Sequence, residues 1–298
     1  MSVLSLEQFI ADHAVASQVA LFVGLITSLW FAELWIARGR VDGKWRHGGI
    51  NGAFILIALP VQLVMTTLLA GVSLWVVTHN WGLIRFLPGG DVPWFHYLVL
   101  FFLLDFCDYL YHRMMHRVAP FWRFHLVHHS DHIVDVTTTV REHPGETVVR
   151  MSLLCLWTFL LGVSFGVLLF RQTVETLANL FAHTSLRLPP RLARVIGWIF
   201  ITPNLHHVHH HPRRPFTDCN YGDVFSIWDR LCGTYREMPE GRSEYGLDTH
   251  PHIGADTPFL KIIAMGFQDP ARSATALRAP VLGEPVPVLV VERNGESG

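Results

Sequence analysis

Three long apolar segments constrain the fold of this 298-residue chain more than any other feature. A helix needs about 20 apolar residues to cross a hydrocarbon core that is about 30 Å thick. The segments at about 14–37, 50–77 and 94–111 are close to this length or exceed it, and Pro60 in the second predicts a tilt or kink in one crossing. Only 16% of the residues are charged, against about 25% in a typical soluble domain. We therefore expect an all-α integral membrane protein.

The loops between these segments predict the orientation of the protein. The first loop contains Arg38, Arg40, Lys44 and Arg46, whereas the loop at 79–93 contains Arg85 alone. By the positive-inside rule the first loop is cytoplasmic, so the third span delivers the chain from residue 112 onward to the cytoplasmic face. Arginine makes up 21 of the 23 basic residues, which hints at a GC-rich bacterial genome and hence a bacterial inner membrane.

A fourth apolar stretch begins near residue 148 and has histidines on both sides. If these histidines build one site, the chain between them must cross an even number of times. We therefore predict a hairpin at about 148–182 that turns near Gly162 to Gly166, with arms of about 24 Å that are short for a full crossing. The fold is then about four transmembrane or re-entrant helices with a cytoplasmic helical cap formed by 112–147 and 183–250. The alternative is a single span, which would place the histidines on opposite sides of the membrane.

The returning arm of the hairpin carries polar residues at intervals of four. These are Arg171, Glu175, Asn179 and His183, which share one face of a helix. Ionisable groups at membrane depth usually face the bundle interior or a cavity, so this face is predicted to point toward the histidine site. The alternative is an interfacial helix with a solvated polar face.

Histidines are the second unusual feature of the chain. Thirteen of the 19 lie between His112 and His211, in clusters that read HRMMH, HLVHH and HHVHH. Spacings of three and four put imidazoles on one helix face, about 5 to 6 Å apart at Cβ, where they can converge on metal ions. The eight candidates are more than one ion uses, which favours two metals: His112, His116, His125, His128, His129, His206, His209 and His210.

Polar neighbours could orient these imidazoles, because a metal-bound histidine commonly donates its other N–H to a carboxylate or carbonyl. The predicted orienting residues on the third span and the returning arm are Asp105, Asp108, Tyr109, Glu175 and Asn179; Asp131, Asp218 and Asp223 follow the later clusters. For Asp105 and Asp108 the alternative is a simple charge near a helix end.

The segments LLDFCDYLYHRMMHR, PFWRFHLVHHS, REHPGE, FAHTSLRLP, TPNLHHVHHHP and NYGDVFSIWDRLCGTY occur in this order between residues 104 and 235. Together they resemble the fatty acid hydroxylase superfamily, also called the sterol desaturase family, of integral-membrane di-iron proteins. The resemblance implies metal ligation by the eight histidines above and by His143 and His183. The last cluster also reads HxxHH from His207, but the preceding TPNL favours the register that starts at His206. In REHPGE, Arg141 could instead pair with Glu146 or Asp135.

The resemblance further implies O2-dependent chemistry on a lipid C–H bond, with two iron ions as cofactor. Zinc could occupy the sites of a purified sample, but it is redox-inert and cannot support this reaction. Hydroxylation is the expected outcome and desaturation the alternative, and sterol, fatty acyl, carotenoid and ether lipids all fit an apolar cavity. Because the chain shows no haem segment, flavin fingerprint or cysteine array, we expect a separate electron donor such as a ferredoxin or cytochrome with its reductase. The net charge of −1 gives no indication of nucleic-acid binding.

Two other functional classes fit less well. A metal transporter would carry ligands along its spans, whereas these spans are nearly free of histidine. A zinc hydrolase would usually show HExxH, which is absent. We expect residues 1–270 to form a single membrane-embedded domain, and the segment at 271–298, rich in proline and glycine, to form a flexible tail.

Overall fold

The computed structural model describes residues 13–36, 43–87, 93–238, 244–254 and 257–268. Within these ranges the secondary structure is helical, and the only β interaction is an isolated bridge between Phe200 and Phe225. The expectation of an all-α fold is therefore confirmed. Two predicted features, the arginines at 38 and 40 and the tail at 271–298, lie outside the described residues.

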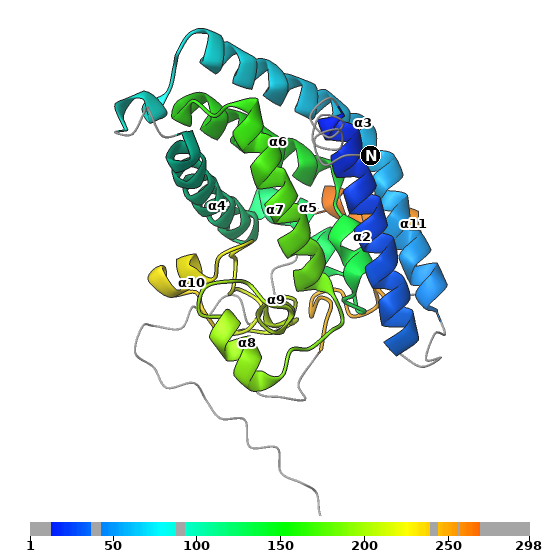
Figure 1. The fold of residues 1–298 in the computed structure, drawn as a ribbon. Helices are drawn as coiled ribbons and strands as arrows, with labels where there is room; N and C mark the ends of the chain where they lie inside the picture. Colours follow the sequence, from blue (N-terminus) through cyan, green and yellow to red (C-terminus); the bar gives the residue numbers. More distant parts are fainter. Residues whose placement is uncertain (1–12, 37–42, 88–92, 239–243, 255–256, 269–298) are drawn as a thin grey trace, which may run out of the picture.

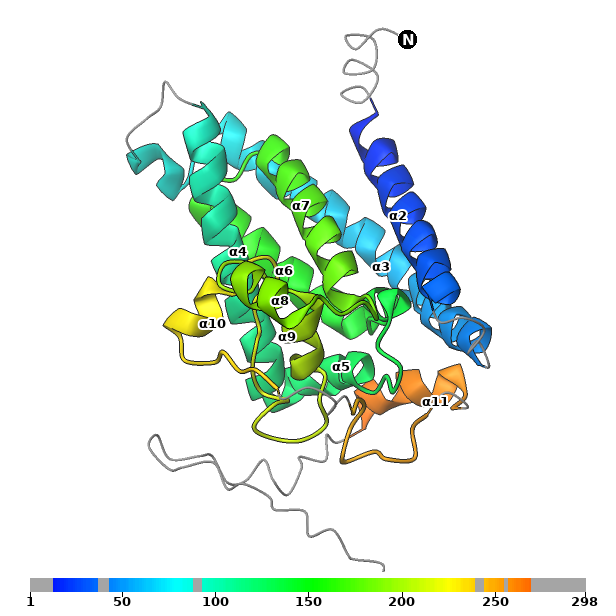
Figure 2. The same ribbon diagram turned by 60° about the horizontal axis from the view of Figure 1, so that its bottom comes forward.

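Long helices run alongside one another, and short helices gather at one end of them (Figures 1 and 2). The long helices are α2 (Ala14–Ile36), α3 (Lys44–Thr78), α4 (Pro93–Arg117), α6 (Pro144–Leu161) and α7 (Phe165–His183). The short helices of the cap are α5 (Ala119–His129), α8 (Pro190–Ile196), α9 (Pro203–His209), α10 (Ile227–Leu231) and α11 (Phe259–Ala264). Three 3-10 helices, η1 (Leu83–Phe86), η2 (Val136–Val140) and η3 (Met265–Phe267), complete the described elements.

Three segments of the described chain are long and apolar enough to cross a membrane: Ala16–Ile36, Lys44–Phe86 and Trp94–Arg117. They correspond to the three spans expected from the sequence. Two of the helices extend further than the apolar runs suggest. Helix α3 starts six residues before residue 50 and buries His47 and Asn51 in the cap, and α4 continues six residues past 111. The HRMMH cluster consequently lies on the last turns of a membrane helix.

The hairpin between α6 and α7 is present, and its turn lies where glycines interrupt the apolar stretch. Helix α6 ends at Gly162, which adopts a left-handed conformation with φ of 81°. A Cβ added to Gly162 would lie 2.3 Å from the carbonyl oxygen of Trp81, so the turn packs against the loop after α3 only because no side chain is there. The hydroxyl of Ser73 donates to the carbonyl of Val163 at 3.0 Å. Two helices joined by this turn thus replace one continuous span, and they bring residues on either side of the hairpin together: Nε2 of His128 lies 3.2 Å from Nε2 of His183.

The described residues form three apolar clusters, of which the smallest packs Phe101 against Val224 and Phe225, and the other two hold the bundle and the cap together. One joins α3, α4, α6 and α7 in the bundle and includes Leu69, Leu104 and Leu154. The other joins the start of α3 to the cap and includes Phe54 and Leu126. The cap cluster gains from removing apolar area from water, whereas the bundle cluster depends on close packing because lipid is as apolar as leucine.

Helix α2 is held to the bundle near its two ends. Near its start, the amide of Gln18 donates to the carbonyl of Leu169 at 2.8 Å and to the hydroxyl of Thr173 at 3.0 Å. Near its end, the buried Glu33 accepts from the backbone N–H of Ser185 at 2.7 Å and from that of Val136 at 3.3 Å.

Candidate metal centre

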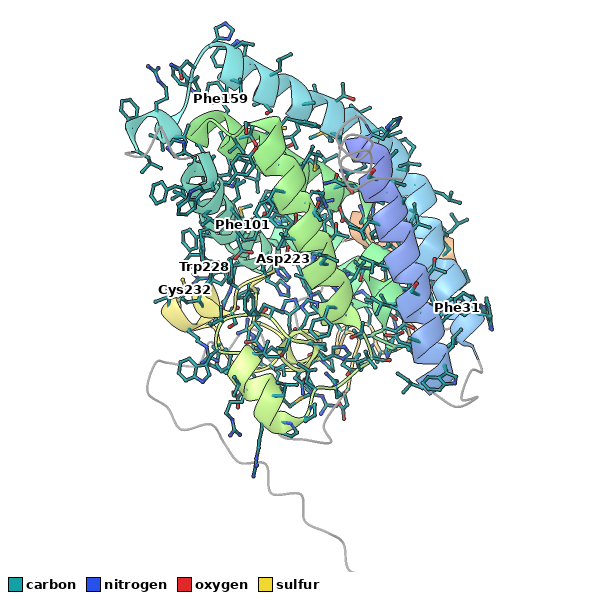
Figure 3. All side chains as sticks on the ribbon, viewed as in Figure 1. Phe31, Phe101, Phe159, Asp223, Trp228 and Cys232 are labelled. Atoms are coloured by element: carbon teal, nitrogen blue, oxygen red, sulfur yellow. The ribbon has the colours of Figure 1, made fainter. Side chains whose placement is uncertain are left out.

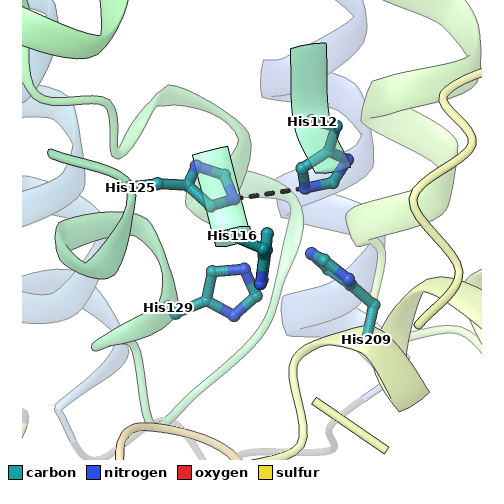
Figure 4. A group of neighbouring side chains, drawn as sticks. All are labelled: His112, His116, His125, His129 and His209. Carbon is teal, nitrogen blue, oxygen red and sulfur yellow. Dashed lines mark hydrogen bonds between the residues drawn. The ribbon is translucent and has the colours of Figure 1, made fainter. Parts of the chain in front are cut away.

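Nine of the ten predicted histidine ligands come together in two groups. The five-histidine group consists of His112, His116, His125, His129 and His209, and the four-histidine group consists of His128, His183, His206 and His210. In each group, one nitrogen from every ring lies within 4.8 Å of all the others. Figure 4 shows the five-histidine group, in which rings from α4, α5 and α9 face one another.

Helical spacing explains how neighbouring residues serve different groups. His125 and His129 are four apart on α5 and enter the five-histidine group, whereas His128 enters the other group. At the end of α9, His206 and His210 are four apart and share the four-histidine group.

His207 lies outside both groups. Its Nε2 is 2.9 Å from the carbonyl oxygen of Thr184, and its Nδ1 is 2.7 Å from the hydroxyl of Tyr245. The structure thus places the residues of the His206 register, and not His207, at the candidate centre.

Outward hydrogen bonds orient the rings of the five-histidine group. The Nδ1 atoms of His112 and His209 donate to the carbonyls of Tyr221 at 3.0 Å and Cys219 at 2.7 Å. His125 donates through Nδ1 to the carboxylate of Glu146 at 2.6 Å. A longer contact of 3.4 Å joins His116 Nδ1 to Asp218.

Two rings of the four-histidine group are oriented in the same way. His128 Nδ1 donates to the carbonyl of Arg141 at 3.3 Å, and His183 Nδ1 donates to the carbonyl of Asn179 at 2.9 Å. Asn179 therefore contributes to the orientation of a ring, as expected, but through its backbone.

The inward nitrogens are placed as metal ligands would be. Because His128 and His183 each carry a proton on Nδ1, their Nε2 atoms present lone pairs to each other, yet they lie only 3.2 Å apart. His112 and His125 face each other in the same way at 3.1 Å. Two buried acceptors repel at this distance unless a cation lies between them, and ligands about 2.1 Å from one metal ion are separated by about 3 Å. The residues present fit a bound metal in both groups.

Burial keeps these rings in the neutral form that binds metal. Burial and then the neighbouring imidazoles lower the pKa of His128, His129, His206 and His210 well below the usual 6.5. The same two causes lower the pKa of His209 to about 3. Metal ions therefore meet little competition from protons at neutral pH.

The predicted orienting residues Asp105 and Tyr109 act on the loop after α9 instead of on the rings. Asp105 accepts from the backbone N–H of Val224 at 3.1 Å and from the indole N–H of Trp228 at 2.6 Å. The hydroxyl of Tyr109 lies 3.0 Å from that of Thr234. Both residues fix the segment whose carbonyls orient His112 and His209.

The other predicted orienting residues, Asp108 and Glu175, form a carboxylate cluster with Asp223, which Figure 3 labels between α4 and α7. Arg171 pairs with Asp108 at 2.6 Å and with Glu175 at 2.9 Å. The side-chain amide of Asn179 donates to Asp223 at 3.0 Å. Asp108, Glu175 and Asp223 line the cavity beside the histidines, and among the described residues none of them hydrogen-bonds to a ligand ring.

The structure does not bring His143 to either group. Its Nδ1 accepts from the backbone N–H of Gly145 at 2.9 Å, which caps the start of α6, and its ring stacks on Phe124 with centroids 5.0 Å apart. Pro144 is the first residue of α6, so His143 and Pro144 act here as the N-cap and the first residue of a helix.

Sequence reasoning missed a buried polar network that supports the four-histidine group. Nε2 of His47 lies 2.8 Å from Asp131, and the amide of Asn51 donates to Asp131 at 3.2 Å. Arg141 donates to the carbonyl of Val127 at 2.9 Å and to Asn51 at 3.1 Å, and pairs with neither Glu146 nor Asp135 in the described contacts. Little in the sequence indicates this network, because a single histidine near the start of a helix, such as His47, has the same pattern as a histidine on the protein surface.

A cavity of about 350 Å³ lies against the two groups. Five of the nine ligand histidines line it, together with Asp108, Glu175 and Asp223. At its other side it reaches apolar residues of α2 and α3, namely Phe22, Ile55 and Leu59. The cavity thus connects the histidine site with helices whose outer faces are long and apolar enough to meet a bilayer.

Comparison with known proteins agrees with this geometry. The family model described as fatty acid hydroxylase matches residues 97–234. Alkylglycerol monooxygenase of Caenorhabditis elegans is 34% identical over 179 residues, which cover 59% of this chain and 33% of that protein. Human alkylglycerol monooxygenase is 30% identical over 235 residues, covering 75% of this chain and 48% of that protein.

A bacterial relative also matches. Ornithine lipid hydroxylase of Rhizobium tropici is 33% identical over 143 residues, covering 47% of this chain and 42% of that protein. The chain thus spans about a third to a half of the length of these curated relatives. No solved structure matches the chain significantly. The matched segment contains every histidine of the two groups, and residues 97–234 are therefore a fatty acid hydroxylase domain.

Proposed function

We propose that this protein is a membrane-bound oxygenase that hydroxylates a C–H bond of a lipid, with two iron ions as cofactor and O2 as co-substrate. The observation that carries the proposal is the cavity shared by both histidine groups and the apolar residues of α2 and α3. A lipid can reach such a cavity from the bilayer, and its C–H bond then lies beside the metal centre. The relatives named as monooxygenase and lipid hydroxylase support the same reaction class.

The five-histidine group would hold one ion and the four-histidine group the other. Imidazole ligands suit iron, zinc and copper alike, but only a redox-active metal supplies the oxidising chemistry that an unactivated C–H bond requires. The chain's own residues hold the ligands in place through the Nδ1 contacts of His112, His125 and His128, and the cavity wall presents the lipid to them.

A metal transporter is disfavoured by the position of the ligands. All nine histidines lie in two adjoining groups on the cap helices and on the ends of α4 and α7, so they form a centre and not a path across the membrane. The basic residues of the first loop support a cytoplasmic cap. We propose that the electrons come from a separate donor, such as a ferredoxin or cytochrome with its reductase.

The test is reconstitution of the full chain in lipid nanodiscs with ferrous iron, followed by O2 uptake and product analysis with an alkylglycerol, a fatty acyl lipid and a sterol. We expect O2 consumption that requires iron, a reductant and one of these lipids, and a product that has gained a hydroxyl group. An alkene product would indicate desaturation. Activity supported by zinc alone in the absence of O2 would contradict the proposal.

A further inference from the structure

Three polar side chains that line the cavity form no hydrogen bond with a ligand histidine in the described structure. They are Gln62 on α3, Glu142 just before α6 and Arg150 on α6. Polar and ionisable groups within a membrane bundle are costly to retain and usually mark a functional surface.

The three side chains form one connected group. Nη2 of Arg150 donates to Glu142 at 3.1 Å and to the amide oxygen of Gln62 at 3.2 Å. Thr147 also donates to Glu142, at 2.7 Å. The side chains of Arg150 and Glu142 remain 24% and 26% exposed, so they present unused surface to the cavity. The second guanidinium nitrogen, Nη1, meets the sulfur of Met151 at 3.8 Å, which is a weak acceptor.

This group is close to the metal centre along α6. Glu146, which accepts from His125, lies four residues before Arg150 and therefore one helical turn away, about 5 to 6 Å at Cβ. A ligand atom held by Arg150 would consequently lie near the carbons that face the histidine groups.

We propose that Gln62, Glu142 and Arg150 form a polar clamp for an uncharged, hydroxyl-bearing lipid head group, and that the clamp directs oxidation to carbons close to that head group. This inference rests on the proposed function. An Arg–Glu pair offers a donor and an acceptor side by side, which suits a hydroxyl because a hydroxyl both donates and accepts.

The charges at the clamp itself argue against an anionic head group. Arg150 is the one arginine or lysine among the residues that line the cavity, and its guanidinium already pairs with the carboxylate of Glu142 at 3.1 Å. A carboxylate or phosphate at the clamp would therefore also face the like charge of Glu142. A neutral diol meets no such repulsion.

Lipid binding tests the clamp without any turnover. The zinc-loaded full chain in nanodiscs would be titrated with 1-O-hexadecylglycerol, hexadecane and palmitate in competition with a fluorescent lipid. We expect the neutral diol to bind at least tenfold tighter than the other two. Arg150→Leu and Gln62→Leu each remove most of this preference, Arg150→Lys retains part of it, and Thr67→Val, on the outer face of α3, retains all of it. A wild-type preference for palmitate, or an unchanged preference in both leucine variants, would overturn the clamp.

Turnover separates this inference from the proposed function. With iron, reductant and O2, we expect wild-type protein to oxidise 1-O-hexadecylglycerol at carbons near the glycerol, and Arg150→Leu to raise KM and spread oxidation along the chain. If wild-type protein oxidises no lipid, the proposed function fails even where the binding preference is present. If it oxidises lipid and the leucine variants change neither KM nor the oxidised position, the clamp fails alone.

Discussion

Backbone carbonyls orient more of the ligand rings than carboxylates do. His112, His128, His183 and His209 donate to carbonyls, and His125 donates to Glu146. A side-chain substitution cannot remove a backbone carbonyl. The carboxylate of Glu146 is therefore the orienting group that mutagenesis can test most directly. A partner of this kind typically changes metal affinity by 10- to 100-fold when it is lost.

Glu146→Gln is therefore expected to weaken metal binding at the five-histidine group by about 10- to 100-fold and to leave the four-histidine group near its wild-type affinity. The reason is loss of the charge-assisted bond to His125. Metal titration followed by elemental analysis measures both sites, and Glu237→Gln, which changes an exposed glutamate, is the control. Two sites of unchanged affinity would show that Glu146 has no such role.

Single ligand removals should separate the two groups. We expect His128→Ala and His209→Ala each to lose about one of two bound metals, because each takes a ligand from a different group. His207→Ala and His143→Ala should keep both, although His143→Ala loses a helix cap worth about 1 kcal/mol. The number of metal ions bound per protein molecule checks these predictions. Loss of a metal from His143→Ala would show that His143 is a ligand after all.

At this scale the sequence predicted which histidines gather but not what holds them. Periodicity and resemblance identified nine residues that the structure brings together. The orienting groups were harder to predict, because carbonyls of Tyr221 and Cys219 have no side-chain signature and become partners only when the loop at 219–235 folds back on α4. His47 and Asp131 are 84 residues apart, so no local pattern links them.

Among the helices, the turn between α6 and α7 is the most constrained point. Gly162 has φ of 81° and the carbonyl of Trp81 against the position of its missing Cβ. Gly162→Ala should destabilise the protein by about 1 to 2 kcal/mol for the left-handed backbone, and by more for the clash. Gly71→Ala on α3 is the matched control, since nothing lies within 4 Å of its missing Cβ. Thermal unfolding of both variants in detergent checks this, and equal melting temperatures would contradict it.

The helices themselves could be predicted from apolar length, but their ends could not. The apolar run starts at residue 50, whereas α3 starts at Lys44 because its first turns bury His47 and Asn51 against the cap. Similarly, α4 runs on to Arg117, and its last turns place His112 and His116 in the five-histidine group. In both cases distant tertiary contacts decide where a polar helix end is stable.

For the molecule as a whole, the two ends of the bundle should lie on opposite sides of the membrane. In a background in which Cys155 and Cys232 are replaced by serine, an impermeant maleimide should label Asp248→Cys from the cytoplasmic side and Thr78→Cys from the other. The buried Cys107 and Cys219 should not react in the folded protein. Labelling of both engineered cysteines from one side would contradict the proposed topology.

The hairpin also determines when the metal centre can be completed during synthesis. Each group combines residues that precede α6 with residues that follow it: His112 and His209 in one, His128 and His210 in the other. A nascent chain therefore holds only partial ligand sets until the α6–α7 hairpin has folded back and residue 210 has been made. Under the proposed function, full metal occupancy would report that this chain has been assembled correctly, and metal acquisition would follow folding as a checkpoint on it.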